Sequence, residues 1–251
     1  MFRPRIIPVL LIKDGALVKS IRFKNHKYIG DPINAVRIFN DLKADELVFL
    51  DIEASRKNRL LSLDLIKDVG EEACMPFAVG GGIRSIEDIK AVIAAGAEKV
   101  VVNTRAGQDP EFIKRASDAF GSTTIVVCID VKTKLLKGER TWILNGRRST
   151  GFTPLEFAAL MEKNGAGELM VQSIDRDGTM DGFDIGLVRS ISEAVNIPVV
   201  ALGGAGSPED LIDAYKAGRA NGLAAGSLFV YRDRKRGVLI NYPDKSELTF
   251  E

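Results

Sequence analysis

Cysteine and histidine are scarce in this sequence, which contains two of the first and one of the second. Cys74 and Cys128 lie in apolar contexts without the close spacing of metal ligands. We therefore expect two buried, reduced thiols in a cytoplasmic protein, with no bound metal and no other cofactor. His26 lies in the polar stretch "RFKNHKYIGD", where we expect a solvated loop residue without a chemical role.

An excess of charge of one sign is also absent, because 35 Lys and Arg balance 34 Asp and Glu. This balance gives no overall attraction to nucleic acid or to membranes, so any recognition of an anion must be local. No stretch reaches the roughly 18 apolar residues of a membrane helix. The start, "MFRPRIIPVLLIKDG", has too short an apolar run for a signal peptide and no small-residue cleavage site, so we expect a buried strand there.

The sequence does contain a regular alternation of short β-branched runs and amphipathic stretches. The amphipathic stretches predict helices, several of which begin at Ser, Thr or Asp and end at Gly or Asn. This alternation is typical of an α/β fold with a parallel sheet covered by helices, and eight units in about 250 residues favour a (β/α)8 TIM barrel over an open sheet. The runs predict strands at 5–12, 46–52, 76–80, 98–103, 123–130, 168–174, 198–202 and 221–226.

The two halves of the chain resemble each other. "ADELVFLDIEAS" (44–55) matches "AGELMVQSIDRDG" (166–178), and "MPFAVGGGIRSIEDI" (75–89) matches "IPVVALGGAGSPEDL" (197–211). An internal repeat of this kind indicates a closed barrel built from two four-stranded halves. We therefore predict a single domain over residues 1–251, with half-barrels at about 1–121 and 122–251.

The first and fifth predicted strands end in residues of different chemistry. In the repeat, Leu11 of "PVLLIKDG" corresponds to Asp130 of "VCIDVKTK". Active sites of TIM barrels form at the C-terminal ends of the strands, so Asp130 is the best candidate for acid–base catalysis. The alternative is a structural aspartate that accepts hydrogen bonds from loop amides. Asp51 and Asp175 also lie near this rim.

Glycine-rich loops follow several predicted strands. Glycine before a helix lets backbone N–H groups approach a phosphate. In the repeat, the loops after strands three and four form one group and those after strands seven and eight form another, which predicts a ligand with phosphate at both ends. Simple tight turns are the alternative. The loops are "GGGIRS" (80–85), "VNTRAG" (102–107), "DRDGT" (175–179), "LGGAGS" (202–207) and "AAGSLF" (224–229).

Further charged residues are candidates at both ends of the predicted barrel. Lys13 and Lys19 would add positive charge at the mouth or lie exposed, and Asp177 would brace its loop or contact the ligand. Four residues at the N-terminal ends of strands one, two, four and six would form a ring of alternating sign around the axis. Such a ring would gate a passage, plug the barrel or be ordinary surface charge; its members are Arg5, Glu46, Lys99 and Glu168.

These motifs together resemble the cyclase subunit of imidazole glycerol phosphate synthase, over residues 1 to about 230. The resemblance rests on "RIIPVLLIKDGALVK", "ADELVFLDIEAS", "VGGGIRSIEDI", "VVVNT", "GAGELMVQSIDRDGT" and "LGGAGSPEDL". Members of that family take ammonia from a glutaminase docked at the barrel bottom and pass it along the axis to a bisphosphorylated substrate.

The resemblance implies roles for two sets of residues. It implies that the four charged residues gate ammonia. It also implies two phosphate cradles, with the register open by one residue around 219–226. The cradles would contain Gly82, Asn103, Thr104, Gly178, Gly204 and Ser227, to which we add Lys19, Asp177 and Gly226 as candidate ligand contacts.

Two features depart from the family. Its catalytic pair is an aspartate at the end of strand one and another at the end of strand five, but the first position here is Leu11, which cannot transfer a proton. The chain also ends in "RGVLINYP" where the family has an amphipathic helix. Both departures resemble a branch associated with surface-polysaccharide biosynthesis, in which the barrel and a glutaminase supply ammonia to an ATP-dependent sugar amidotransferase.

Three functions are compatible with this pattern. The leading interpretation is a cyclase-like subunit that conducts ammonia for amidation of a nucleotide-linked sugar, with Leu11 arguing against cyclase activity of its own. The second is a histidine-pathway cyclase in which Asp51 or a loop carboxylate replaces the missing aspartate. The third is a non-enzymatic activator of a glutaminase that senses a phosphate ligand. Expected partners are the glutaminase at the N-terminal face, a sugar amidotransferase and a phosphorylated small molecule, but neither nucleic acid nor membrane.

Overall fold

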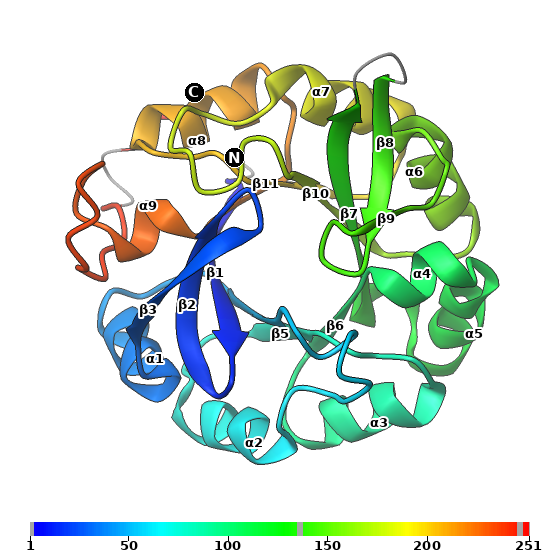
Figure 1. The fold of residues 1–251 in the computed structure, drawn as a ribbon, viewed down its shortest axis with the longest axis horizontal. Helices are drawn as coiled ribbons and strands as arrows, with labels where there is room; N and C mark the ends of the chain where they lie inside the picture. Colours follow the sequence, from blue (N-terminus) through cyan, green and yellow to red (C-terminus); the bar gives the residue numbers. More distant parts are fainter. Residues whose placement is uncertain (1–2, 135–137, 245–247, 251) are drawn as a thin grey trace.

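The computed structural model describes residues 3–134, 138–244 and 248–250, and in it eight parallel strands close into a barrel (Figure 1). Each strand pairs with the next, and the last pairs with the first. The predicted (β/α)8 TIM barrel is confirmed, and the two half-barrels stay a prediction whose outer limits, 1–2 and 251, lie outside the described residues. The strands are β1 (Arg5–Lys13), β4 (Leu47–Asp51), β5 (Phe77–Gly80), β6 (Lys99–Val102), β7 (Ile125–Lys134), β10 (Glu168–Ser173), β11 (Val199–Leu202) and β12 (Gly222–Ala225).

Helices cover the outside of the barrel (Figure 1). Their starts follow the expected chemistry, because Ser85 and Thr153 each form a capping box with the acidic residue three positions later. Within the described residues no helix has the length and apolar character needed to cross a membrane. The longer helices are α1 (Pro32–Asp41), α2 (Leu63–Glu72), α3 (Ile86–Ala94), α5 (Glu111–Phe120), α6 (Pro154–Lys163), α7 (Ile185–Ala194) and α8 (Pro208–Lys216), and the short ones are α4 (Thr104–Gln108), η1 (Ser122–Thr124) and α9 (Ser227–Val230).

The period of two along each strand divides the core into two parts. In β1, Ile6, Leu10 and Ile12 pack against the helices, whereas Ile7 and Val9 belong to a separate cluster inside the barrel. The inner cluster also contains Val48, Ala78, Val101, Val126, Cys128, Met170, Val200, Leu202 and Ala224. The same alternation places Arg5 and Leu11 at the two ends of the inward row of β1.

Strand pairing supports the correspondence between Leu11 and Asp130. Leu11 pairs with Leu50 on β4, and Asp130 pairs with Gln172 on β10, the equivalent strand of the second half.

Pairing also settles the register that the sequence left open by one residue. Gly80 pairs with Val101 and Leu202 pairs with Ala224, so the second half has one extra residue before β12. Thr104 therefore corresponds to Ser227, and Asn103 to Gly226.

Two hairpins at the barrel mouth were not predicted. β2 (Ala16–Ile21) and β3 (Lys24–Gly30) follow β1, whereas β8 (Gly138–Ile143) and β9 (Arg148–Ser149) follow β7 (Figure 1). The expectation that His26 lies in a loop was therefore wrong, because it is an exposed residue of β3. The reason is that most of β3 is exposed on both faces, so its sequence lacks the alternation that indicates a strand.

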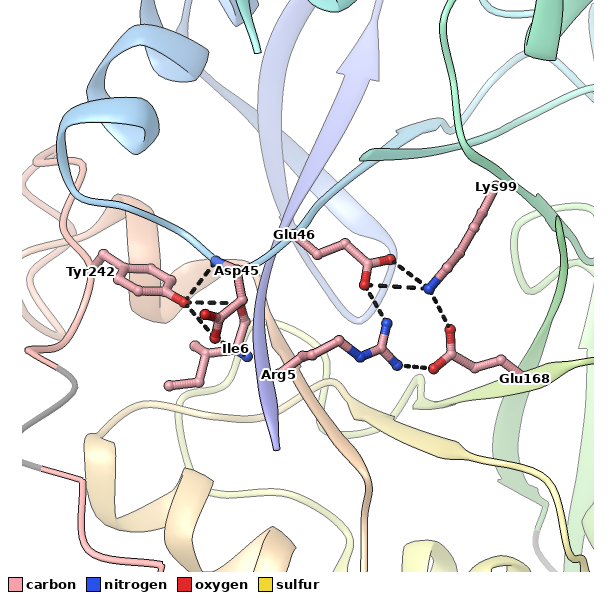
Figure 2. A network of polar contacts seen from close by, with 7 residues as sticks. All are labelled: Arg5, Ile6, Asp45, Glu46, Lys99, Glu168 and Tyr242. Carbon is pink, nitrogen blue, oxygen red and sulfur yellow. Dashed lines mark hydrogen bonds and ion pairs between the residues drawn. The ribbon is translucent and has the colours of Figure 1, made fainter. Parts of the chain in front are cut away.

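The C-terminal segment lies against the outside of the barrel, between α8 and α1 (Figure 1). Residues 231–244 contain no helix, and Tyr231 forms an isolated bridge with Val238. The ring of Tyr242 lies 5.6 Å from that of Phe229. Its hydroxyl reaches the bottom of the barrel, where it donates to the Ile6 carbonyl at 3.0 Å and accepts from the Asp45 amide at 3.1 Å (Figure 2). The C-terminal segment is thus hydrogen-bonded to the backbone of Ile6 and Asp45, the sequence neighbours of Arg5 and Glu46.

Replacing Tyr242 by Phe is expected to lower the free energy of unfolding by about 1–2 kcal/mol, because buried partners lose their hydrogen bonds. Urea unfolding measures this change. Tyr28→Phe is the matched control, since the Tyr28 side chain is exposed (66%) and its loss should change stability by less than about 0.5 kcal/mol. Equal effects of the two substitutions would contradict the structural role of Tyr242.

Candidate functional site

Two pockets lie side by side at the C-terminal ends of the strands. The first is lined by the loops after β4, β5 and β6, and the second by the loops after β10, β11 and β12. Leu11, Ser20 and Gln172 line both pockets, so they lie between them. The first pocket encloses about 800 Å³ including its open mouth, and both hairpins contribute to its wall through Phe23 and Leu144. His26 also lines this pocket, contrary to the expectation that it has no place in the site.

The first cradle consists of Gly82, Asn103 and Thr104, which all line the first pocket. Gly82 has a φ of +77°, and a Cβ there would lie 1.8 Å from the Arg59 carbonyl oxygen, so only glycine fits. The Asn103 side chain donates to the carbonyls of Cys128 and Trp142, which fixes the loop after β6. The Thr104 hydroxyl accepts from the amide of Leu144.

The second cradle consists of Gly178, Gly204, Gly226 and Ser227, which line the second pocket. At Gly178 and Gly204 a Cβ would lie 2.1 Å from a backbone carbonyl oxygen, so the chain comes too close there for any side chain. Gly204 and Gly82 also share a positive φ, as expected for equivalent positions of a repeat. The paired geometry disfavours the alternative that these glycines are unrelated tight turns.

Lys19 enters the second pocket from β2. Its side chain is buried, with 5% of the residue exposed, which rules out the alternative that Lys19 lies exposed. Its ammonium donates to the Val9 carbonyl, and a Cβ on Gly226 would lie 2.3 Å from Nζ. Burial lowers the pKa of Lys19 to about 8, and the charge of Asp177 acts in the opposite direction. A bound anion would further favour the charged form of this lysine.

Asp130 lies at the mouth with only 6% of the residue exposed, and it lines the first pocket. Burial raises the pKa of Asp130 to about 7; the hydrogen bond from the Cys128 thiol opposes this, and the charge of Asp177 adds to it. In the described part of the chain it accepts no loop amide, which contradicts the structural alternative for this residue. A carboxyl group that titrates near neutral pH can both accept and donate a proton.

The other rim aspartates brace loops. Asp51 accepts from the amides of Glu53 and Ala54 at 2.9 and 3.0 Å and forms an ion pair with Arg59. These contacts engage both carboxylate oxygens of Asp51 and argue against its replacing a missing catalytic aspartate. Asp175 accepts from the amide of Thr133 at 2.9 Å.

Asp177 braces the loop that carries the second cradle. It accepts from the Ser20 hydroxyl at 3.1 Å, from the Gln172 amide group at 3.3 Å and from the backbone of Phe23. Burial raises the pKa of Asp177 above its ordinary value, and these hydrogen bonds and the Lys19 charge offset only part of that rise. These contacts join the β2–β3 hairpin to the loop after β10.

At the opposite end, Arg5, Glu46, Lys99 and Glu168 meet at the barrel axis and form the charged ring (Figure 2). Arg5 pairs with both glutamates, and the Lys99 ammonium lies 3.2 Å from Glu46 and 3.3 Å from Glu168. The glutamate side chains are nearly buried, whereas Arg5 is 32% and Lys99 is 23% exposed. The ring is therefore a closed circuit of four ion pairs, which excludes the interpretation as independent surface charges.

Asp130→Asn is expected to stabilise the protein more at pH 8 than at pH 5. An unfolded chain ionises aspartate near pH 4, whereas the folded chain holds the Asp130 proton up to about pH 7. The folded state thus binds the additional proton in this window, and rising pH lowers wild-type stability in a way that asparagine avoids. The difference in free energy of unfolding should grow by about 2–3 kcal/mol from pH 5 to pH 8, measured by urea unfolding.

The matched control for this measurement is Asp118→Asn on α5, whose side chain is 65% exposed. It should change stability by the same small amount at both pH values. An Asp130→Asn effect that does not depend on pH would contradict the raised pKa of this carboxyl group.

Sequence reasoning missed several residues of the mouth. Ser20 and Gln172 line both pockets but are ordinary polar residues without a motif.

Cys74 was expected to be buried, but it is exposed because it follows the end of α2 at the barrel bottom; Cys128 is buried as expected. In the described ranges, no group of three or more His, Cys, Asp or Glu residues could hold a metal ion.

The fold and these loops define a TIM barrel with glycine-lined sites at the C-terminal ends of its strands, the arrangement in which such barrels hold phosphate groups. The family model described as "Histidine biosynthesis protein" matches residues 5–235. The chain belongs to this family, and within it to the HisF-like cyclase subunits of imidazole glycerol phosphate synthase.

Individual relatives cover nearly the whole chain. A Pseudomonas aeruginosa protein, provisionally named imidazole glycerol phosphate synthase subunit hisF2, is 47% identical over 248 residues, or 99% of each chain. A Leptospira interrogans protein with a similarly provisional HisF name is 42% identical over 248 residues, or 98% of each chain. The imidazole glycerol phosphate synthase subunit HisF of a Nostoc species is 43% identical over 251 residues, which cover 99% of this chain and 97% of that protein.

Proposed function

We propose that this protein is the cyclase-like subunit of a glutamine amidotransferase that conducts ammonia for the amidation of a nucleotide-linked sugar in surface-polysaccharide biosynthesis. The observation that carries the proposal is the combination of a complete charged ring with a leucine at the end of β1. Acid–base catalysis by the barrel alone would require both carboxylates at the mouth and would not require the charged ring. This chain has the ring and lacks one of the two carboxylates, which fits the conduction of ammonia better.

The partner that supplies ammonia would be a HisH-like glutaminase at the N-terminal face. The charged ring supports this location, because Lys99 and Arg5 are partly exposed and present polar groups at the axis. Ammonia would enter as the neutral molecule between the ion pairs and continue along the inner cluster, in which Ala78 and Ala224 have the smallest side chains. An ATP-dependent sugar amidotransferase would use it at the other end.

A second function, the cyclase of histidine biosynthesis, is favoured by two observations. The candidate residues of both cradles line pockets at the mouth, and burial raises the pKa of Asp130 to about 7, which suits an acid–base residue. The difference between the two functions lies in Leu11, and the test of that residue is argued in the Discussion.

Blocking the axis tests the conducting role. Ala78→Leu places a larger side chain inside the barrel, whereas Ala201→Leu, the matched control, adds the same atoms on the side of β11 that faces the helices. With glutaminase and sugar amidotransferase present, Ala78→Leu should lower glutamine-driven amidation at least tenfold and leave ammonium-driven amidation unchanged.

The control variant should retain both activities, and urea unfolding should show comparable stability for the two variants. Glutamine-driven amidation that survives Ala78→Leu would overturn conduction through the axis. Such a result would favour the third function, in which the barrel only activates its glutaminase.

A further inference from the structure

A third pocket lies beside the first cradle, on the outer side of the barrel mouth. Thr104, Ser55 and Arg56 line this pocket and also line the first pocket, so the two are continuous. Its other polar groups include three more arginines and Gln108 of α4. We call it the arginine pocket after its four arginines, Arg56, Arg84, Arg105 and Arg147.

The charge in the arginine pocket is not balanced by its own lining. Among the residues that the structure describes, no Asp or Glu lines it, although the whole chain has a formal net charge of only +1. Arg84 lies at the limit of ion pairing, 3.9 Å from Asp88. Arg105 shares Asp109 with Arg115, at 2.8 and 2.6 Å, and its Nε is buried without a hydrogen bond.

The two remaining guanidinium groups are not paired with protein. In the part of the chain that the structure describes, the side chains of Arg56 and Arg147 form no ion pair, and both residues are exposed. Four like charges around one depression repel each other, and the repulsion is relieved when an anion binds among them. Guanidinium groups also fit phosphate oxygens with two parallel hydrogen bonds, which makes phosphate the anion that the lining matches best.

We infer that the arginine pocket receives the second phosphoryl group of a diphosphate whose first phosphoryl group lies in the first cradle. Thr104 belongs to both sites, so the two positions are neighbours, as the phosphorus atoms of a diphosphate are. A ligand with single phosphates at its two ends would occupy the two cradles and leave Arg56 and Arg147 without an anionic partner. The arginine pocket accounts for the diphosphate, and the proposed function supplies the rest of the ligand, so the class is a nucleoside diphosphate or a sugar attached to one.

This inference deepens the proposed function by naming the ligand class, and it rests on that function for the sugar. Its test uses the isolated barrel without glutaminase or glutamine. A negative result in binding therefore leaves the ammonia-transfer experiment intact, and failure of ammonia transfer leaves the binding result intact.

Isothermal titration calorimetry with inorganic phosphate, inorganic pyrophosphate and uridine diphosphate gives the test. The wild-type barrel should bind pyrophosphate and uridine diphosphate at least tenfold more tightly than phosphate. Arg56→Gln combined with Arg147→Gln should remove this preference. Arg148→Gln is the matched control, because Arg148 is the exposed neighbour of Arg147 but does not line the pocket, and it should keep the preference.

Each other outcome overturns part of the inference. Equal affinity for phosphate and pyrophosphate, or a preference that survives the double substitution, would overturn the second phosphoryl position. Tight binding of pyrophosphate without binding of uridine diphosphate would overturn the nucleoside diphosphate class. Because both substituted arginines are exposed, the variants should unfold at the wild-type urea concentration, which confirms that loss of binding is not loss of folding.

Discussion

The Leu11→Asp variant is expected to form the imidazole product from the bisphosphorylated formimino-ribulose substrate and free ammonium at least about 100-fold faster than the wild-type protein. A positioned acid–base group typically contributes about 10²–10⁴ in rate, so wild-type turnover should lie at or below detection. Leu11 packs against the inner cluster and lies between the two pockets. A carboxylate there would face the reaction space that Asp130 already lines.

The matched control is Leu50→Asp. Leu50 pairs with Leu11 on the neighbouring strand and also lines the first pocket, but the equivalent position of the second half is Gln172 rather than an aspartate. We expect no gain in turnover from this variant. A gain at position 11 alone would show that the family chemistry needs a carboxylate at that one place.

Robust wild-type turnover that is unchanged by Leu11→Asp would have the opposite meaning. A different group would then supply the second proton transfer, and the chain would be a histidine-pathway cyclase. Asp51 would not be that group, since its oxygens are engaged by Arg59 and two loop amides. No turnover in either variant, with pyrophosphate or phosphate binding intact, would show that the barrel lacks more of the cyclase machinery than one aspartate.

The strands could be predicted because their pattern is local. Buried β-branched runs are short, and "VVV" at 100–102 is followed directly by the helix cap Asn103, so the order of strands and helices follows from the chain itself. The equivalence of Leu11 and Asp130 could also be predicted, because the repeat fixes both positions and strand pairing agrees with it.

Lys19 shows what could not be predicted. In sequence it is one of many lysines, and its burial results from the β2–β3 hairpin, which folds it back under Gly226. The arginine pocket has the same origin, since Arg56, Arg84, Arg105 and Arg147 come from four different loops or helices. Sites that depend on contacts between distant segments leave no spacing in the sequence to recognise.

Arg5→Ala is expected to lower the free energy of unfolding by about 3–5 kcal/mol, the largest stability change that we predict. Arg5 pairs with both Glu46 and Glu168, which are nearly buried, and its removal leaves their charge compensated by Lys99 alone. Although burial acts against the charge of Arg5, the two glutamates raise the pKa of Arg5 overall.

Arg3→Ala is the matched control for this substitution. Arg3 forms an ion pair with Asp45 at 2.7 Å in the same region, but it lies outside the charged ring and pairs with one carboxylate rather than with two nearly buried ones. An exposed pair contributes about 0–1 kcal/mol, so urea unfolding should separate the two variants clearly. Equal losses for Arg3 and Arg5 would contradict the closed ring.

A second substitution distinguishes lost charge compensation from lost packing of the Arg5 side chain. Adding Glu168→Gln to Arg5→Ala removes one of the two negative charges that Lys99 would otherwise have to balance, so the double variant should recover at least about 1 kcal/mol relative to Arg5→Ala. If the cost of Arg5→Ala arose from lost contacts of the arginine stem, Glu168→Gln would instead lower stability further. Recovery would show that the ring is held together by its alternation of charge.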